Sequence, residues 1–341
     1  MGLYCLEQLG MTYEKNKKKH YYDNGLCYEG DLKDGKWNGR GVLYRYDDKE
    51  IKFNEDVAKI MEATKSIDPE FVENVFKQEL MKQAHKGKAD NILYEGQFKD
   101  GKKHGLGVEY LDNGVKYNGE FVDDKKEGFG SFIYLDGSKL KCMMHNDKAN
   151  GKGTIYNSDG TIRYEGDFVD GEPEGKGVYY LPTGGVYTGE LKRGKMNGYG
   201  TLNSEGISMY EGEFKDNKMH GRGKYYEKSR LVYDGEYKEN HMTGHGKYYY
   251  NDGSVYEGDM VNGLRHGKGQ YIFQLGMYKG EFHNKLQHGH GILYNEDGSY
   301  YEGEFVDGSR HGPGKQYNED GVCIAELVFD MGRITSTKKL N

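Results

Sequence analysis

Several properties that a large globular enzyme needs are scarce in this chain of 341 residues. Hydrophobic residues make up only 35% of the sequence and the mean hydropathy is −0.95, which is too polar for two large apolar cores. An excess of positive charge is also missing, because the formal net charge is −7. Nucleic-acid binding needs a basic surface that neutralises phosphates, so the charge balance argues against a nucleic-acid partner.

Cysteine and long apolar runs are scarce as well. The chain has four cysteines: Cys5, Cys27, Cys142 and Cys323. They lie far apart without a Cys-x-x-Cys pair, which favours a reducing compartment over a zinc site or a disulfide framework. No apolar run is long enough to cross a bilayer, and the first residues do not resemble a signal peptide. Acylation of Gly2 and Cys5 stays open as a minor alternative, because Leu6 departs from the myristoylation pattern.

Glycine and tyrosine are abundant instead. The chain holds 53 glycines and 32 tyrosines, a combination that indicates many tight turns with stacked rings between them. The segment Tyr28–Leu32, followed by Gly39 and Gly41, recurs with a period of about 23 residues. Its later copies begin at Tyr94, Tyr117, Leu140, Tyr164, Tyr187, Tyr210, Tyr233, Tyr256, Tyr278 and Tyr301. The period predicts an array of equivalent structural units.

Each unit has the pattern of a β-hairpin. The segment Tyr210–Phe214 alternates ring, charge, glycine, acid and apolar residue, which is the period-2 pattern of a strand, and a second strand starts at Gly-x-Gly. Glycine weakens a strand unless a ring covers it, so we expect Tyr and Phe rings to lie over the glycines. We place Gly221 and Gly244 beneath such rings, and expect valine at either position to destabilise the array by about 1–3 kcal/mol.

These elements resemble the MORN repeat (membrane occupation and recognition nexus), with its YxGxF segment and following GxG. The resemblance covers about residues 21–329 apart from one insertion. It implies an all-β repeat array, an elongated twisted antiparallel sheet of stacked β-hairpins. The family's settings are ciliary and cytoskeletal scaffolds, junctional proteins that bridge membranes, and accessory regions of lipid kinases and lysine methyltransferases. The unit beginning at Leu140 departs from the pattern, and we expect a bend or a binding point there.

The period fails between Tyr44 and Tyr94, where 43 extra residues are inserted. The apolar residues there change to helical spacing, which predicts one inserted helical hairpin. Its apolar face either packs on the sheet or docks a partner, and both alternatives stay open. The expected organisation is an N-terminal tail (1–20), a first hairpin with a partial cap (21–46), the helical insertion (47–91), the repeat array (92–329) and a C-terminal tail (330–341).

Two recurring residue types could suggest chemistry. Histidine precedes Gly-x-Gly in five units: His104, His220, His266, His288 and His311. Equivalent positions in adjacent units lie about 10 Å apart, whereas each zinc ligand lies about 2 Å from its ion, so we predict hydrogen bonding at turns and no metal site. Acids at the fourth position of most units are expected opposite basic residues such as Lys152. A feature repeated so often is architectural, so we expect no catalytic residue, cofactor or small-molecule substrate.

The sequence therefore predicts a non-catalytic scaffold or adaptor that binds other proteins in a large assembly. The favoured setting is cytoplasmic and cytoskeleton-associated, with the ciliary axoneme foremost. Two alternatives stay open. One is a peripheral membrane adaptor that binds anionic phospholipid through short basic patches, and the other is a regulatory subunit of an enzyme complex.

Three methionines are the candidate contacts for a partner. Met196, Met219 and Met242 stand one period apart, which places them in one line at turns, roughly 10 Å from each other. Either each thioether covers its own turn or the three form a docking strip, since methionine adapts to many binding surfaces. A second contact near the N-terminus is predicted at Trp37 and at the inserted helices, represented by Phe71 and Phe76.

Overall fold

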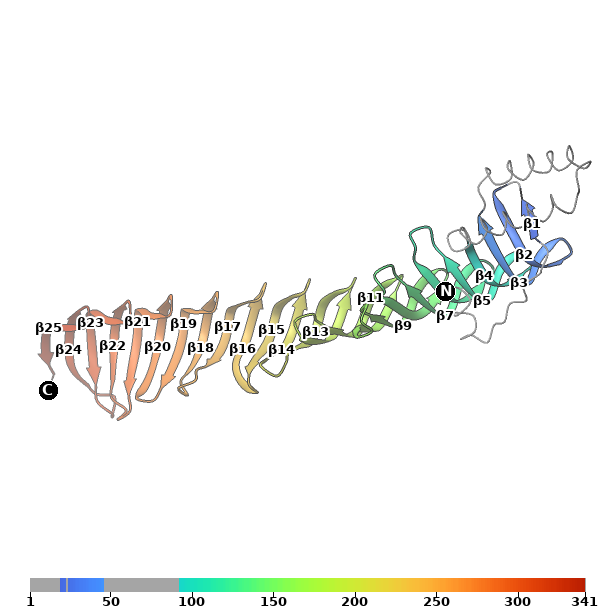
Figure 1. Ribbon diagram of the computed structural model, residues 1–341. Coiled ribbons are helices and arrows are strands. Elements are labelled where there is room, and N and C mark those ends of the chain that lie inside the picture. The colour runs from blue at the N-terminus through green and yellow to red at the C-terminus, as the bar shows by residue number, and fades with distance from the viewer. Residues whose placement is uncertain (1–18, 23, 46–91, 341) are drawn as a thin grey trace, which may run out of the picture. The chain divides into compact units, whose positions relative to one another are not determined.

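The computed structural model describes residues 19–22, 24–45 and 92–340, and every regular element among them is a β-strand (Figure 1). The chain divides into two compact units, Met1–Gly171 and Glu172–Asn341, which are described separately. The predicted helical insertion (47–91), with Phe71 and Phe76, lies outside the described residues, as do Gly2 and Cys5.

The described residues of the first unit form ten strands. They are β1 (Lys19–Tyr22), β2 (Leu26–Lys33), β3 (Lys36–Arg45), β4 (Ile92–Lys99), β5 (Lys102–Tyr110), β6 (Lys116–Val122), β7 (Lys125–Ile133), β8 (Lys139–His145), β9 (Lys148–Tyr156) and β10 (Ile162–Val169). Each strand pairs antiparallel with the next one in sequence, from β1 to β10. The pairing of β3 with β4 continues the sheet across the insertion.

The second unit contains fifteen strands. They are β11 (Glu172–Tyr180), β12 (Val186–Lys192), β13 (Lys195–Ser204), β14 (Ser208–Lys215), β15 (Lys218–Glu227), β16 (Arg230–Lys238), β17 (His241–Tyr249), β18 (Val255–Val261), β19 (Leu264–Phe273), β20 (Gly276–His283), β21 (Leu286–Asn295), β22 (Tyr300–Val306), β23 (Ser309–Tyr317), β24 (Cys323–Asp330) and β25 (Arg333–Lys339). They also pair antiparallel in sequence order, from β11 to β25. The predicted all-β antiparallel hairpin array is thus confirmed, and β25 lies within the stretch expected as a tail.

Tyrosine rings over glycine form the core of both units. The first residue of nearly every repeat is a fully buried tyrosine, and its ring lies over two glycines that face each other across the strands. At Gly212, an added Cβ would meet the Cα of Gly223 at 2.5 Å and the Tyr210 hydroxyl at 2.6 Å. No side chain fits there while the ring is present, so the expected packing of rings over glycine is confirmed.

The two glycines singled out from the sequence were the wrong ones. Gly221 and Gly244 have φ of +57° and +58°, and an added Cβ would meet the carboxylates of Glu213 and Glu236 instead of a ring. The cause is a register shift between Gly212 and Phe214 and its counterpart in the next repeat, which turns the first glycine of each Gly-x-Gly into the left-handed region. The second glycine of the pair is the one beneath the ring.

Two repeats lack the tyrosine and lack the glycine as well. Cys142 occupies the glycine position between Gly130 and Gly153, in the repeat that begins with Leu140. Leu327 stands opposite Gly314 in the last repeat, whose first residue is Ala325. Both substituted side chains are buried. Where the ring is lost, a larger residue therefore fills its space, and β8 keeps its pairing with both neighbours.

The hydroxyl groups explain why the ring is tyrosine and not phenylalanine. Tyr187 donates a hydrogen bond to the Glu190 carbonyl at 2.7 Å, and Tyr256 does the same to Asp259 at 2.7 Å. For nine of the ring tyrosines the acceptor is the carbonyl three residues along, at the register shift, where the ladder leaves a carbonyl without its usual partner. The buried hydroxyl of Tyr301 has no hydrogen-bond partner among the described residues. Burial raises the pKa of Tyr187 and of Tyr233 to about 12.

Candidate partner-binding face

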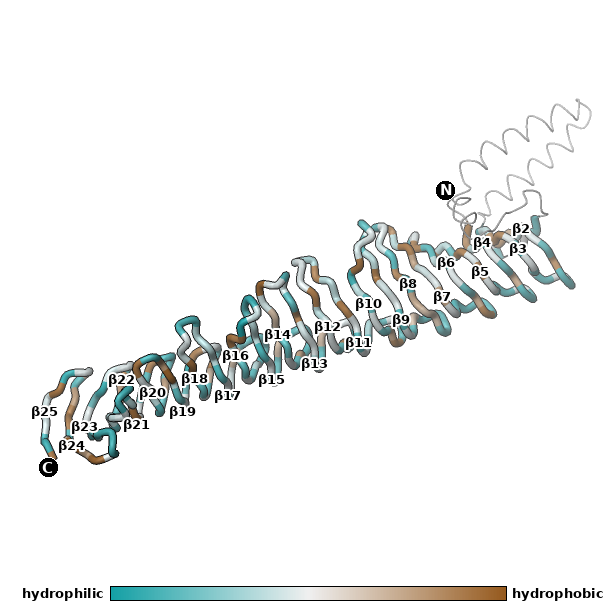
Figure 2. Tube along the Cα trace, turned by 90° about the horizontal axis from the view of Figure 1, so that it is seen from below, coloured by the Kyte–Doolittle hydropathy of each residue, from teal (hydrophilic) through white to brown (hydrophobic). Residues whose placement is uncertain are grey.

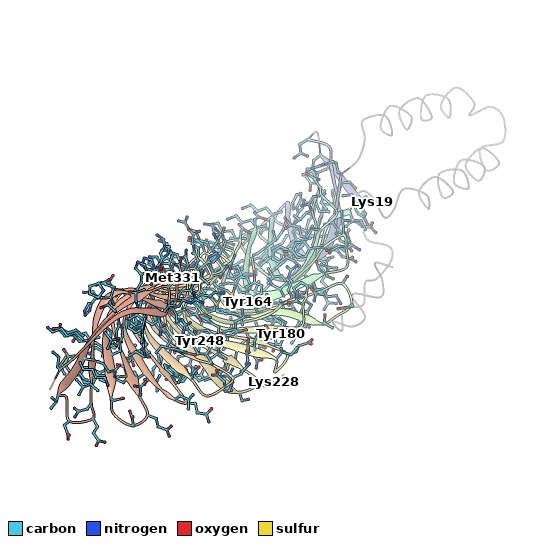
Figure 3. All side chains as sticks on the ribbon, turned by 90° about the vertical axis from the view of Figure 1, so that its left-hand side faces the viewer. Lys19, Tyr164, Tyr180, Lys228, Tyr248 and Met331 are labelled. Carbon is cyan, nitrogen blue, oxygen red and sulfur yellow. The ribbon has the colours of Figure 1, made fainter. Side chains whose placement is uncertain are left out.

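The strands present two faces of different chemistry, because successive side chains of a strand point to opposite faces of the sheet. Hydrophilic and hydrophobic residues occur along the same strands in Figure 2. The ring face carries the first, third and fifth residues of each repeat, for example Tyr210, Gly212 and Phe214. The charged face carries the residues between them, for example Glu211 and Glu213. Side chains project from both faces in Figure 3.

The acids of the charged face have structural roles. Asp167 lies opposite Lys152, as the sequence predicted, and the two form an ion pair with Lys152 Nζ 2.7 Å from Asp167 Oδ1. Glu213 accepts a hydrogen bond from the backbone N–H of Arg222 at 2.9 Å. The carboxylate of Glu213 thereby fills the space above Gly221. Such exposed pairs contribute little stability each, so this face behaves as solvated architecture.

Three of the five histidines that precede Gly-x-Gly face acids of the next turn: His104, His288 and His311. The ring of His266 lies against the ring of His283 instead. The distances from His Nδ1 to Asp Oδ1 are 3.6 Å for His288 and Asp307, and 3.9 Å for His104 and Asp123. Among the described residues no group of three His, Cys, Asp or Glu side chains could hold a metal ion. The two His–Asp distances are too long for hydrogen bonds, and the buried Nδ1 atoms of His104 and His288 have no hydrogen-bond partner in the described part of the chain, so the hydrogen bonding predicted at the turns is absent there.

The residue two places before each Gly-x-Gly lies against the buried aromatic rings of the ring face. In the first unit, Trp37 stacks on Tyr28 with ring centroids 5.3 Å apart and donates a hydrogen bond to the Tyr22 hydroxyl at 2.6 Å. Lys103 occupies the same position one repeat later, with Nζ 5.5 Å from the Tyr94 ring centroid. Trp37 is therefore packed into the ring layer.

Charge is neutralised on the ring face of the first unit. The ammonium groups of Lys103 and Lys126 both contact the carboxylate of Glu109, which lies on the same face. Burial favours the protonated carboxyl, but the two ammonium groups outweigh it and hold the pKa of Glu109 below its ordinary value. These cations consequently have an internal partner.

In the second unit the same position holds the methionine row, which we define as Met196, Met219 and Met242. All three side chains are half-buried. Their cross-strand partners are buried: Leu191, Phe214 and Tyr237. Asn217 accepts the backbone N–H of Met196 at 2.8 Å, and Asn240 accepts that of Met219 at 2.8 Å. The next hairpin turn therefore fixes the backbone of Met196 and of Met219, while the three side chains remain partly exposed.

A second row on this face was missed by sequence reasoning. Leu202, Tyr225 and Tyr248 stand two residues after the second glycine of their repeats, opposite the buried ring tyrosines. All three are half-buried. Their position two residues after a ring-facing glycine was the available signal. The two rows together give the ring face of the second unit a partly exposed apolar surface.

The comparison with known protein families settles what these repeats are. Eleven segments match the MORN repeat: residues 28–48, 94–116, 117–139, 143–162, 164–186, 187–204, 210–227, 233–255, 256–274, 278–300 and 301–323. The chain belongs to the MORN repeat family. The fourth match begins at Met143, past the Leu140 position where the tyrosine is lost. Only MORN repeats are found, which is consistent with a non-catalytic repeat protein.

Other comparisons add little to the MORN assignment. A search of curated proteins gave no match. Among solved structures, the chain is similar to BamB from Moraxella catarrhalis, with 7% identity, a TM-score of 0.14, and 64% of this chain and 92% of that one covered. It is also similar to a streptogramin B lyase, with 11% identity, a TM-score of 0.14, and coverage of 68% and 78%. TM-scores this low bear on neither fold nor function.

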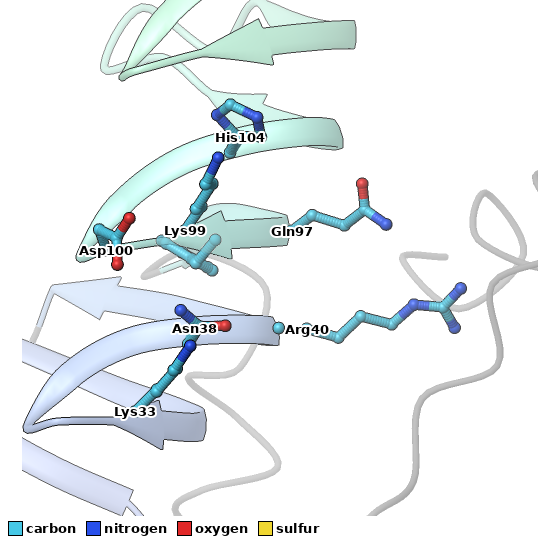
Figure 4. A pocket seen from close by; sticks show the side chains of 9 residues that line it. Lys33, Asn38, Arg40, Gln97, Lys99, Asp100 and His104 are labelled. Carbon is cyan, nitrogen blue, oxygen red and sulfur yellow. The ribbon is translucent and has the colours of Figure 1, made fainter.

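The pocket at the hairpin turns of β2 to β5 does not gather side chains for chemistry. Lys33, Lys99 and Asp100 line it from the turns. In Figure 4 the side chains of Arg40 and Gln97 extend away from Asp100, so the polar groups of these MORN repeats do not converge on one point. Within the described part of the chain, no helix is long and apolar enough to span a membrane.

Proposed function

We propose that this MORN repeat protein is a non-catalytic scaffold whose second unit binds a protein partner on its ring face. The proposal is carried by two rows of partly exposed side chains on this face. They are the methionine row and the row of Leu202, Tyr225 and Tyr248. Adaptable thioethers next to tyrosine rings are typical of protein-binding surfaces.

The setting that we propose is a large cytoplasmic assembly of the cytoskeleton, with the ciliary axoneme foremost. The net charge of −7 supports a protein partner over an anionic membrane, since basic residues supply much of the attraction to such a surface. The basic residues near the C-terminus fit this reading, because Lys338 Nζ lies 3.0 Å from the Glu326 carboxylate.

Changing Met196, Met219 and Met242 together to glutamate should abolish capture of the partner. Carboxylates on the half-buried row must be desolvated when a partner covers them, so we expect at least about tenfold less captured protein. The measurement is a cross-linked pull-down from extract of ciliated cells, with the captured proteins quantified by mass spectrometry. Circular dichroism should show the same β-sheet content as the parent.

The matched control changes the residue that precedes each methionine: Lys195, Lys218 and His241, all exposed, to glutamate. This control adds at least as much negative charge in the same strands without touching the ring face, so capture should persist. Equal capture by the methionine variant and the parent would contradict the proposal. Flotation of the parent with phosphatidylserine vesicles, but not with neutral ones, would favour a membrane adaptor instead.

A further inference from the structure

The methionine row continues into two arginines. Arg265 follows Met242 at the equivalent position one repeat later, and Arg310 follows two repeats after that. The Arg265 guanidinium carbon lies 4.3 Å from the Tyr271 ring centroid and 5.5 Å from that of Phe282. Arg310 lies 4.6 Å from the Tyr301 ring centroid. Both cations thus rest on the rings of the same face as the methionines.

Neither arginine has a carboxylate within ion-pair distance in the described part of the chain. The Nε of Arg265 is buried without a hydrogen-bond partner. Burial lowers the pKa of Arg310, which is the mark of a cation with too little compensation. Contact with rings offsets part of this cost, but a guanidinium also presents donors that match a carboxylate.

In the first unit, the cations at the equivalent positions do have a carboxylate partner. There, Lys103 and Lys126 hold the row position, and Glu109 stands two residues after the second glycine and bridges them. The residues equivalent to Glu109 beside the two arginines are Tyr271 and Gln316, which carry no charge. The second unit therefore has the cations of this arrangement without its carboxylate.

We propose that the ring face of the second unit takes an acidic, amphipathic protein segment. Its carboxylates pair with Arg265 and Arg310, in the role that Glu109 has in the first unit, and its apolar side chains lie on Met219 and Met242. The inference rests on the proposed function and adds the chemistry of the partner. Equivalent positions lie about 10 Å apart, so a helical segment would place its contacts about seven residues apart along the face.

The test uses a display library of random peptides about 20 residues long, selected against the full chain. Selected peptides should be rich in Asp and Glu as well as in apolar residues. Their affinity should fall at least about tenfold for the variant Arg265→Gln/Arg310→Gln and should weaken with added salt. Lys268→Gln, which removes an exposed cation from the charged face of the same repeat, is the control and should leave the affinity unchanged.

A second variant separates loss of the positive charge from loss of the guanidinium that packs on the rings. Arg265→Lys keeps the cation, and it should retain the preference for acidic peptides. Peptides that depend on the three methionines but show no acidic excess, or that bind the double glutamine variant normally, would overturn the inference and leave the proposed function standing. Failure to select any binder would overturn it too, as would arginine-dependent binding of phosphatidylserine vesicles in place of peptides.

Discussion

Between about pH 10 and 12 the chain should lose its folded structure in a steep alkaline transition. Burial raises the pKa of the ring tyrosines: those of Tyr187 and Tyr233 reach about 12, and those of Tyr94 and Tyr278 are raised further. The neutral ring is the form that packs over glycine. The contribution of these rings is therefore complete below about pH 10, the ordinary tyrosine value, and is lost as the pH rises toward the folded value.

The effect is large because the ring repeats. One unit of raised pKa corresponds to about 1.4 kcal/mol, and several rings together reach the ~5–15 kcal/mol by which a typical domain is stable. Tyrosinate absorbance and β-sheet circular dichroism, followed on the same sample, should show the buried rings ionising only as the sheet is lost. Ionisation of all the tyrosines while the sheet signal persists would show that the rings are not sealed over glycine.

Exchanging the ring and the glycine together should cost less than the two single changes combined. Gly212→Cys places a side chain against the Tyr210 ring and against the facing backbone of Gly223 and Arg222, and should cost about 1–3 kcal/mol by overpacking. Tyr210→Leu opens a cavity and leaves the Glu213 carbonyl without its hydrogen bond, for about 2–4 kcal/mol. The double variant reproduces the natural combination of Leu140 and Cys142, so the sulfur should occupy the space that the ring leaves.

Urea unfolding of the parent, the two single variants and the double variant gives the coupling free energy directly. We expect the double variant to be more stable than additivity predicts by about 1 kcal/mol or more. Strictly additive losses would mean that ring and glycine do not share the same space. In that case Cys142 and Leu327 would need another explanation.

The sequence predicts those features of the fold that follow from the repeat period, and it does not predict those that depend on the register between strands. The buried tyrosines follow from their period and alternation, and the line of Met196, Met219 and Met242 follows from the period alone. The face to which Gly221 belongs does not follow, because the register shift beside Gly212 changes the alternation within one strand. The face of Tyr225 follows once Gly223 is known to lie beneath the ring, because Tyr225 stands two residues later in the same strand, beyond the register shift.

The arginines illustrate a second limit. Arg265 stands at the repeat position of the three methionines, but within its own repeat nothing distinguishes it from Arg222 on the charged face. Only the register shows that its partner across the strands is Met260, on the ring face. A charge that lies on aromatic rings is therefore a property of the assembled sheet, and it could not be read from one repeat.

Cross-linking from single positions tests directly whether the ring face of the second unit is the binding surface that we propose. A photo-reactive amino acid is placed at Met219 on the ring face or at Lys224, which is exposed on the charged face of the same strand. In ciliated cells we expect Met219 to cross-link to a small, reproducible set of proteins through acidic segments, and Lys224 to give none of them. The same proteins cross-linked equally from both positions, or from Lys224 alone, would contradict the proposal.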